Sequence, residues 1–143
     1  MRPRDVGLLA LVVLAVSACT TMPTPAPTVI DLDARPAHAY IQDLKARIQS
    51  TLTYPCVKNS GGGCEPRDAR VVIEFGILRD GSLRFVDVVA PSGVSIYDTE
   101  SAEAIRRAAP FPPVPADLMA SVPAGSTGIP IRANFNFVVP NSR

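Results

Sequence analysis

Apolar residues recur every three or four positions in two separate parts of the chain. In residues 39–54 this spacing follows one face of a helix and comprises Ile41, Leu44, Ile48 and Leu52. In residues 95–109 the same period is carried by Ala102, Ile105 and Ala109. Pro55 ends the first segment, because a residue before proline is restricted to extended geometry. The pattern predicts two amphipathic helices, the second capped by Asp98 or Thr99.

Three other segments alternate with the period of a β-strand. The first, residues 71–78, has one apolar face, and Asp80-Gly81 then signals a hairpin turn. In the returning strand the apolar parity changes after Leu83, which predicts a bulge near Arg84 or a strand partly covered on both faces. Residues 131–139 alternate cleanly, as expected of a strand with one buried face.

The order of these elements is helix, strand, strand, helix, strand. It predicts an α+β fold in which two helices cover one face of a three-stranded antiparallel sheet. Because a hairpin joins the first two strands, the third pairs most simply beside the first and forms an edge of the sheet. Pro130 and Pro140 bracket this third strand, as edge strands tolerate.

The N-terminus has the pattern of an export signal. Two arginines precede an apolar run over residues 6–16, which is too short to span a bilayer. The run ends in VSAC, residues 16–19, which resembles the lipobox of bacterial lipoproteins. That resemblance implies removal of residues 1–18 and acylation of Cys19, and Thr20 in the next position favours the outer over the inner membrane. The alternatives are an ordinary signal peptide, or a retained one that anchors the chain in the inner membrane.

Residues 19–37 contain four prolines and no helical period, which predicts a linker ahead of a folded domain over residues 38–143. Loss of the signal removes Arg2, Arg4 and Asp5 from 14 basic and 13 acidic residues, and leaves a formal net charge of zero. A neutral domain argues against nucleic acid as a partner.

Cys56 and Cys64 remain once Cys19 is set aside, and they flank the turn-prone stretch VKNSGGG. In an exported protein an even pair at this spacing favours a disulfide. The spacing is too long for a two-residue redox motif, and a metal site would need further ligands. We therefore expect a Cys56–Cys64 bridge and no metal or other cofactor.

Signatures of catalysis are missing from the sequence. The single histidine, His38, lies where the linker meets the first helix, and exposure to solvent explains it better than a catalytic role. There is no nucleophile elbow and no HExxH motif. The acidic residues Glu74, Asp80 and Asp98 are explained by a solvent face, a turn and a helix cap. We expect a protein that is not an enzyme.

Several of these features occur together in one known family. The YP that ends the first helix, the hairpin VVIEFGILRDGSLRFVDVVAPSG, the segment DTESAEAIRRAAPFPPVP and the final IRANFNF resemble the C-terminal domain of TonB- and TolA-type proteins. The likeness covers about residues 40–139. It implies an α-β-β-α-β domain in the periplasm that binds other proteins.

In TonB such a domain captures a short segment of an outer-membrane receptor along its last strand. Carried over here, the resemblance implies a docking edge whose backbone N–H and C=O groups bind the partner. Its residues are Ile131, Arg132, Ala133, Asn134, Phe135, Asn136, Phe137, Val138 and Val139. The alternatives are a solvated edge or one that joins two copies in a homodimer.

Phe111 lies between prolines in the loop that returns to this strand, and we expect it to anchor the loop on the core. The alternative is that PFPP is a polyproline ligand for an aromatic groove.

TonB and TolA have an uncleaved membrane helix and a long spacer, whereas this sequence has a lipobox and a short linker. Energy transduction by a chain acylated at Cys19 is therefore not expected. The sequence predicts a lipid-anchored periplasmic module that binds a protein, such as an outer-membrane receptor or an envelope complex, in receptor-linked transport. The alternative is a structural or self-associating envelope lipoprotein with the same fold.

Overall fold

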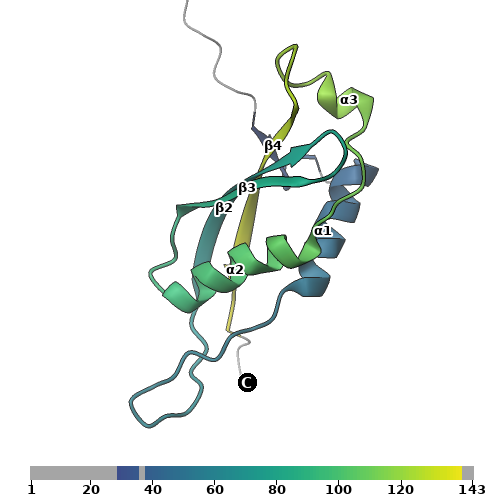
Figure 1. Ribbon diagram of the computed structural model, residues 1–143. Helices are drawn as coiled ribbons and strands as arrows, with labels where there is room; N and C mark the ends of the chain where they lie inside the picture. The colour runs from purple at the N-terminus through teal and green to yellow at the C-terminus, as the bar shows by residue number, and fades with distance from the viewer. Residues whose placement is uncertain (1–28, 36–37, 140–143) are drawn as a thin grey trace, which may run out of the picture.

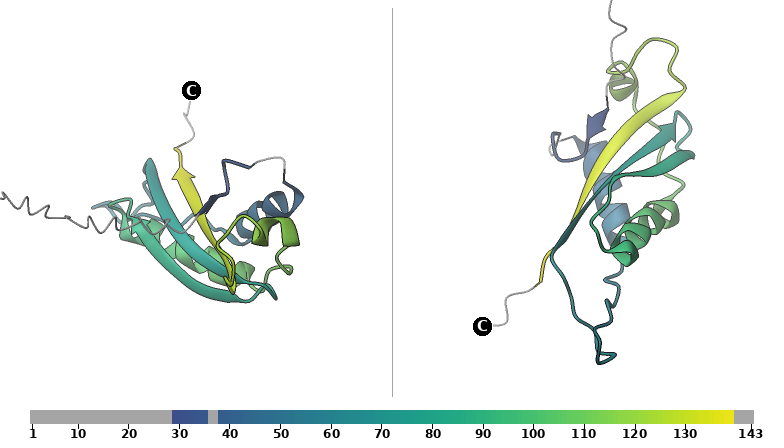
Figure 2. Two further views of the ribbon diagram at one scale, coloured as in Figure 1. Left: turned by 90° about the horizontal axis from the view of Figure 1, so that it is seen from above. Right: turned by 90° about the vertical axis from the view of Figure 1, so that its left-hand side faces the viewer.

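The computed structural model describes residues 29–35 and 38–139, and its chain forms one sheet with helices on one face (Figures 1 and 2). The elements are β1 (Ile30–Asp31), α1 (Ala39–Thr51), β2 (Ala69–Leu78), β3 (Leu83–Ala90), α2 (Ser95–Ala108), α3 (Ala116–Met119) and β4 (Gly128–Phe137). The strand order in the sheet is β1-β4-β2-β3. The predicted α+β fold is confirmed, with four strands in place of three.

The centre of the sheet is the antiparallel pair β2 and β4. Their register is unbroken over ten positions, from Ala69 opposite Phe137 to Leu78 opposite Gly128. Side chains of successive strand residues point to opposite faces, so every second residue of each strand faces α1 and α2. These residues are the buried core of the sheet: Val71, Ile73, Phe75 and Ile77 on β2, and Ile129, Ile131, Ala133, Phe135 and Phe137 on β4.

β3 is antiparallel to β2 but irregular. Gly76 lies opposite Phe85 and Ile77 opposite Leu83, so Arg84 has no partner on β2. The bulge predicted near Arg84 is therefore confirmed. A second shift in register lies at the other end of the strand, between the partners of Val72 and Ile73. β3 consequently twists away from a regular ladder at both ends.

Both predicted helices form and pack against each other beneath the sheet. α1 buries Tyr40, Ile41, Leu44 and Ile48, and α2 buries Tyr97, Ser101, Ala102, Ala104, Ile105 and Ala108. The expected cap at Asp98 or Thr99 is wrong, because α2 begins earlier, with Val94 as its N-cap. The Asp98 carboxylate instead accepts the backbone N–H of Ser92 at 2.8 Å, in the loop before the helix.

The proline run after α2 is attached to the β2–β3 hairpin. Phe111 is 4% exposed, and its ring centroid lies 6.0 Å from that of Phe75. Its N–H donates to the carbonyl of Gly81 at 2.9 Å. The Tyr40 hydroxyl donates to the Pro112 carbonyl, also at 2.9 Å, and this bond joins the run to α1. The backbone groups of this loop are thus bound inside the domain.

The strand β1 comes from the segment predicted to be a linker. It pairs in parallel with β4 at two positions, Ile30 with Ile131 and Asp31 with Arg132. Ile30 and Leu32 are 3% and 5% exposed and belong to the core. The expectation that the last strand forms an outer edge along its whole length is therefore wrong, because β1 covers part of it.

Candidate functional site

The outer side of β4 is divided into a covered and an uncovered part. β1 covers Ile131 and Arg132, and the N–H of Leu32 donates to the Arg132 carbonyl at 3.0 Å. Within the described ranges, no strand pairs with this side of β4 beyond Arg132. We call residues 133–137 the free edge.

Backbone groups of the free edge alternate in direction. In an antiparallel ladder, residues whose N–H and C=O bind the neighbouring strand alternate with residues whose groups point away from it. The backbone N–H and C=O of Arg132 point toward β1 and away from β2. Those of Asn134 and Asn136 therefore also point away from β2, past the edge of the sheet. These two residues offer donors and acceptors to a further strand.

A groove of about 300 Å³ runs beside the free edge. One wall is α1 with its C-cap, through Lys45, Ile48, Gln49 and Leu52, and the other is β4 at residues 133–136. Leu32 and Asp33 close one end. A strand added to the free edge would lay alternate side chains over this groove, whose lining includes the apolar Ile48 and Phe135.

Asp33 links the two walls at the closed end of the groove. One carboxylate oxygen accepts Lys45 Nζ of α1 at 2.8 Å, and the other accepts Asn134 Nδ2 of β4 at 3.2 Å. The hydrogen bond from Lys45 is the main reason that the pKa of the Asp33 carboxyl lies below its ordinary value. Both side chains of the ion pair are 48% exposed, so the pair contributes little stability by itself.

The sequence-predicted docking residues fall on two faces. The apolar ones, from Ile131 to Phe137, point into the core, whereas Arg132 and Asn136 are exposed on the opposite face. Arg132 Nε donates to Glu74 on β2 at 3.1 Å. Val138 and Val139 lie beyond β4, and the Val139 N–H donates to Asp68 at 2.7 Å.

Three aromatic rings gather at the end of β4. Tyr97 stacks on Phe137 with centroids 4.3 Å apart, and Tyr54 meets Phe137 edge-on at 5.4 Å. Tyr54 remains 52% exposed. The three residues come from three distant segments, so spacing along the sequence gave no signal for this cluster.

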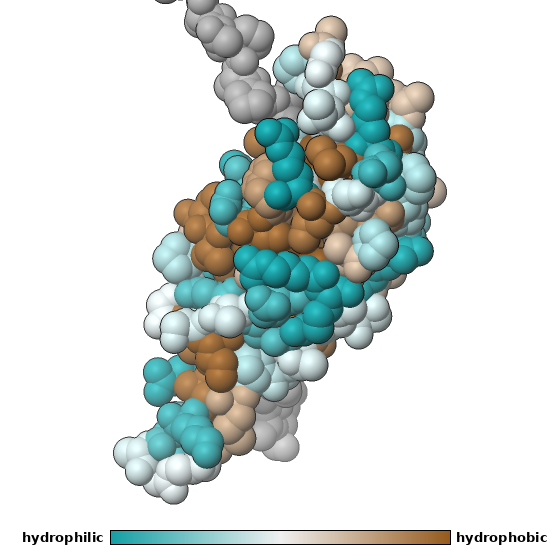
Figure 3. Space-filling view, in the orientation of Figure 1, coloured by the Kyte–Doolittle hydropathy of each residue, from teal (hydrophilic) through white to brown (hydrophobic). Residues whose placement is uncertain are grey.

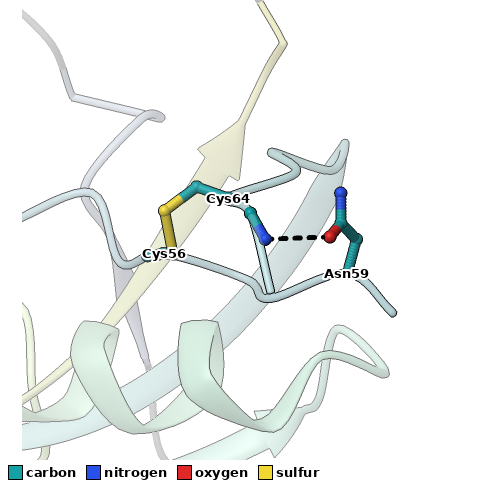
Figure 4. The surroundings of a disulfide bond; sticks show 4 residues. Cys56, Asn59 and Cys64 are labelled. Carbon is teal, nitrogen blue, oxygen red and sulfur yellow. Dashed lines mark hydrogen bonds between the residues drawn. A yellow bond between two sulfur atoms is a disulfide. The ribbon is translucent and has the colours of Figure 1, made fainter. Parts of the chain in front are cut away.

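The predicted disulfide joins Cys56 to Cys64, and Figure 4 shows it closing the exposed loop between them. Asn59 organises the loop from inside, where its Oδ1 accepts the N–H groups of Gly61 and Gly63 at 3.0 Å each. Lys58 lies opposite Cys64 in an isolated bridge. The loop projects from the end of the molecule at which α1 finishes (Figure 1).

Polar clusters suited to chemistry are few in the part of the chain that the structure covers. No group there of three or more His, Cys, Asp or Glu could hold a metal ion. His38 is not simply solvated, since its Nε2 lies 2.8 Å from the Asp117 carboxylate of α3.

No helix among the described residues is long and apolar enough to cross a membrane. Cys19 lies outside them.

A free sheet edge beside a groove is the arrangement that small α+β domains use when an extended peptide adds a strand to their sheet. A family model described as TonB C terminal matches residues 37–125, more than half of the chain, and the chain belongs to this family.

The fold agrees with that assignment. The solution structure of the TonB C-terminal domain of Helicobacter pylori is similar, with a TM-score of 0.55 at 19% identity, over 78% of this chain and 94% of that one. A search of curated proteins gives no match. Family membership indicates a TonB-like role in protein interaction in the cell envelope, in a family that is not enzymatic.

Proposed function

We propose that this chain is a non-enzymatic periplasmic module that binds a partner protein by adding a strand of the partner to the free edge. The observation that carries the proposal is the combination of outward backbone groups at Asn134 and Asn136 with the groove along α1. Backbone hydrogen bonds would supply affinity, and the groove would select alternate side chains of the bound segment.

The proposed partner is an outer-membrane receptor or an envelope complex, in receptor-linked transmembrane transport. Family membership supports this choice. The proposed anchor is an acylated Cys19, which would hold the domain at a membrane, with the outer membrane favoured by Thr20. Several acyl chains on one residue give stable attachment without a membrane-spanning helix.

Photo-crosslinking in cells tests the docking proposal. A photoreactive residue at Asn136 probes the free edge, and one at Asp87 probes β3 at the other side of the sheet. Both side chains are exposed, so the two probes are equally accessible and differ only in the edge of the sheet on which they lie. We expect a crosslink to an outer-membrane or envelope protein at position 136 and none at 87. Equal crosslinks at both positions, or none at 136, would overturn the proposal.

A second candidate function is self-association through the same edge. If Phe135 opposes its own copy in an antiparallel pair, Asn134 of one copy opposes Asn136 of the other, and all outward groups find partners. The segment is therefore self-complementary. Crosslinks at position 136 that join only copies of this chain, together with a dimer in sedimentation, would favour this structural role.

The anchor has its own test. Cys19→Ser should move the protein from the membrane fraction to the soluble periplasmic fraction, because the variant has no thiol to acylate at that position. Cys56→Ser is the control, since it also removes a cysteine but leaves the anchor. Continued membrane residence of Cys19→Ser would count against lipid anchoring.

A further inference from the structure

We propose that residues 30–33 are a releasable cover over the first part of the docking edge, so that the edge exists in a short and a long form. The inference rests on the proposed function, because the edge that is covered is the one proposed to bind a partner. In the short form the edge comprises residues 133–137. In the long form it begins at Ile131.

The cover is held by far fewer backbone contacts than the rest of the sheet. β1 pairs with β4 at two positions, whereas β2 pairs with β4 at ten. Segments with few backbone bonds open without unfolding of the whole domain. Ile30 and Leu32 are nonetheless buried, so the covered form is the resting one and an incoming strand must refill their space.

The cover ends where a local turn bends the chain away from β4. The N–H of Asp33 donates to the Asp31 carboxylate at 2.8 Å, and the N–H of Ala34 donates to the Asp31 carbonyl at 3.2 Å. This turn stops the strand pairing after Leu32, so that β1 does not pair with the backbone of Asn134. The Asp33 side chain then fastens the turn to Lys45 and Asn134, at the closed end of the groove.

Release of the cover would change the length of strand that the edge accepts. Outward backbone groups would increase from two residues, Asn134 and Asn136, to three with Arg132. Pro130 sets the limit on that side, since it has no N–H to offer. A longer partner strand therefore competes directly with residues 30–33. Because these residues precede α1 in the chain, a pull from the N-terminal side reaches them before it reaches the rest of the domain.

Hydrogen exchange of the purified full chain tests the cover without any partner. The Leu32 N–H binds β4, and the Ala133 N–H faces β2. We expect the Leu32 amide to exchange about a hundredfold faster than that of Ala133, and about tenfold faster again in Asp33→Ala. Asp43→Ala is the matched control, since it removes a similarly exposed ion pair to Arg47 on the same helix. Exchange of Leu32 as slow as that of Ala133 would overturn the inference.

Crosslinking then connects the cover to docking. With a photoreactive residue at Arg132, we expect Asp33→Ala to raise the partner crosslink several-fold relative to position 136, and Asp43→Ala to leave it unchanged. An unchanged ratio in Asp33→Ala would show that the cover does not limit docking. Loss of crosslinks at both positions in every variant would instead contradict the proposed function, while hydrogen exchange would still decide on the cover.

Discussion

The two edges of the sheet differ in regularity. β4 keeps an unbroken ten-residue register with β2, and its outer side borders the groove along α1. β3, at the other edge, has two shifts in register. Val88 and Val89 on β3 are 38% and 48% exposed, and Figure 3 shows apolar surface along β3 beside the hydrophilic outer face of α2.

On the proposed function, this contrast would direct a partner strand to one side of the sheet. Bulges bend a strand and interrupt the row of outward N–H and C=O groups that a further strand needs. Apolar exposure on β3 therefore does not make it the better docking edge. On β4 the row is regular, and its covered part limits the length of exposed backbone.

The largest loss of stability is expected from a substitution in the turn between β2 and β3. Gly81 has a φ of +93°, and a Cβ there would lie 1.9 Å from the Phe111 carbonyl oxygen. Gly81→Ala should lower the free energy of unfolding by at least about 3 kcal/mol, because strain in the backbone adds to displacement of the proline run. The measurement is denaturant unfolding of both proteins.

Gly125→Ala is the matched control. Its φ is +85°, and a Cβ there meets nothing within 4 Å, so it tests the backbone strain alone. We expect a loss of about 1 kcal/mol. Equal losses in the two variants would mean that the proline run does not hold the β3 turn.

The next largest loss of stability is expected from the disulfide. Its loop leads from α1 into the central strand β2, so its reduction should weaken the whole domain and not one edge of the sheet. Reduction of Cys56–Cys64 should lower the free energy of unfolding by about 2.5 kcal/mol, as expected from the chain entropy of so short a loop. Unfolding with and without reductant measures this, and a Cys56→Ser/Cys64→Ser protein should not respond to reductant. An unchanged midpoint in the fully reduced wild type would contradict a stabilising bridge.

The central strands could be predicted from the sequence because each has one buried and one open face. That arrangement imposes alternation on Val71 to Ile77 and on Ile131 to Phe137, and the bulge at Arg84 is visible as a change of parity. β1 could not be predicted, since two residues have no period and the nearby prolines indicate a linker. α3 was missed for the same reason, in a connection rich in proline and glycine.

The groove depends on distant segments that tertiary packing brings together. Asp33, Lys45 and Asn134 lie on three different segments, and nothing local to any of them indicates that the three meet. The proposed docking strand follows from the resemblance of the sequence to a family. Its division into covered and free parts required the register of β1.

The smallest effect is the most direct test of the two edges. A proline has no backbone N–H. Asn136→Pro on β4 and Val88→Pro on β3 therefore each remove one N–H group that points away from β2. With the photoreactive residue at Asn134, Asn136→Pro should lower the partner crosslink about tenfold, equivalent to about 1.4 kcal/mol. Val88→Pro should leave it unchanged.

Both proline variants should remain folded, because their outward N–H groups do not bind β2, and unfolding curves check this. Phe135→Pro is the contrasting variant on β4, since it removes both an N–H that points to β2 and a buried ring, and it should destabilise the domain by more than about 3 kcal/mol. If Val88→Pro lowers the crosslink as much as Asn136→Pro, the partner does not distinguish the edges. The regular register of β4 would then not be what selects the docking side.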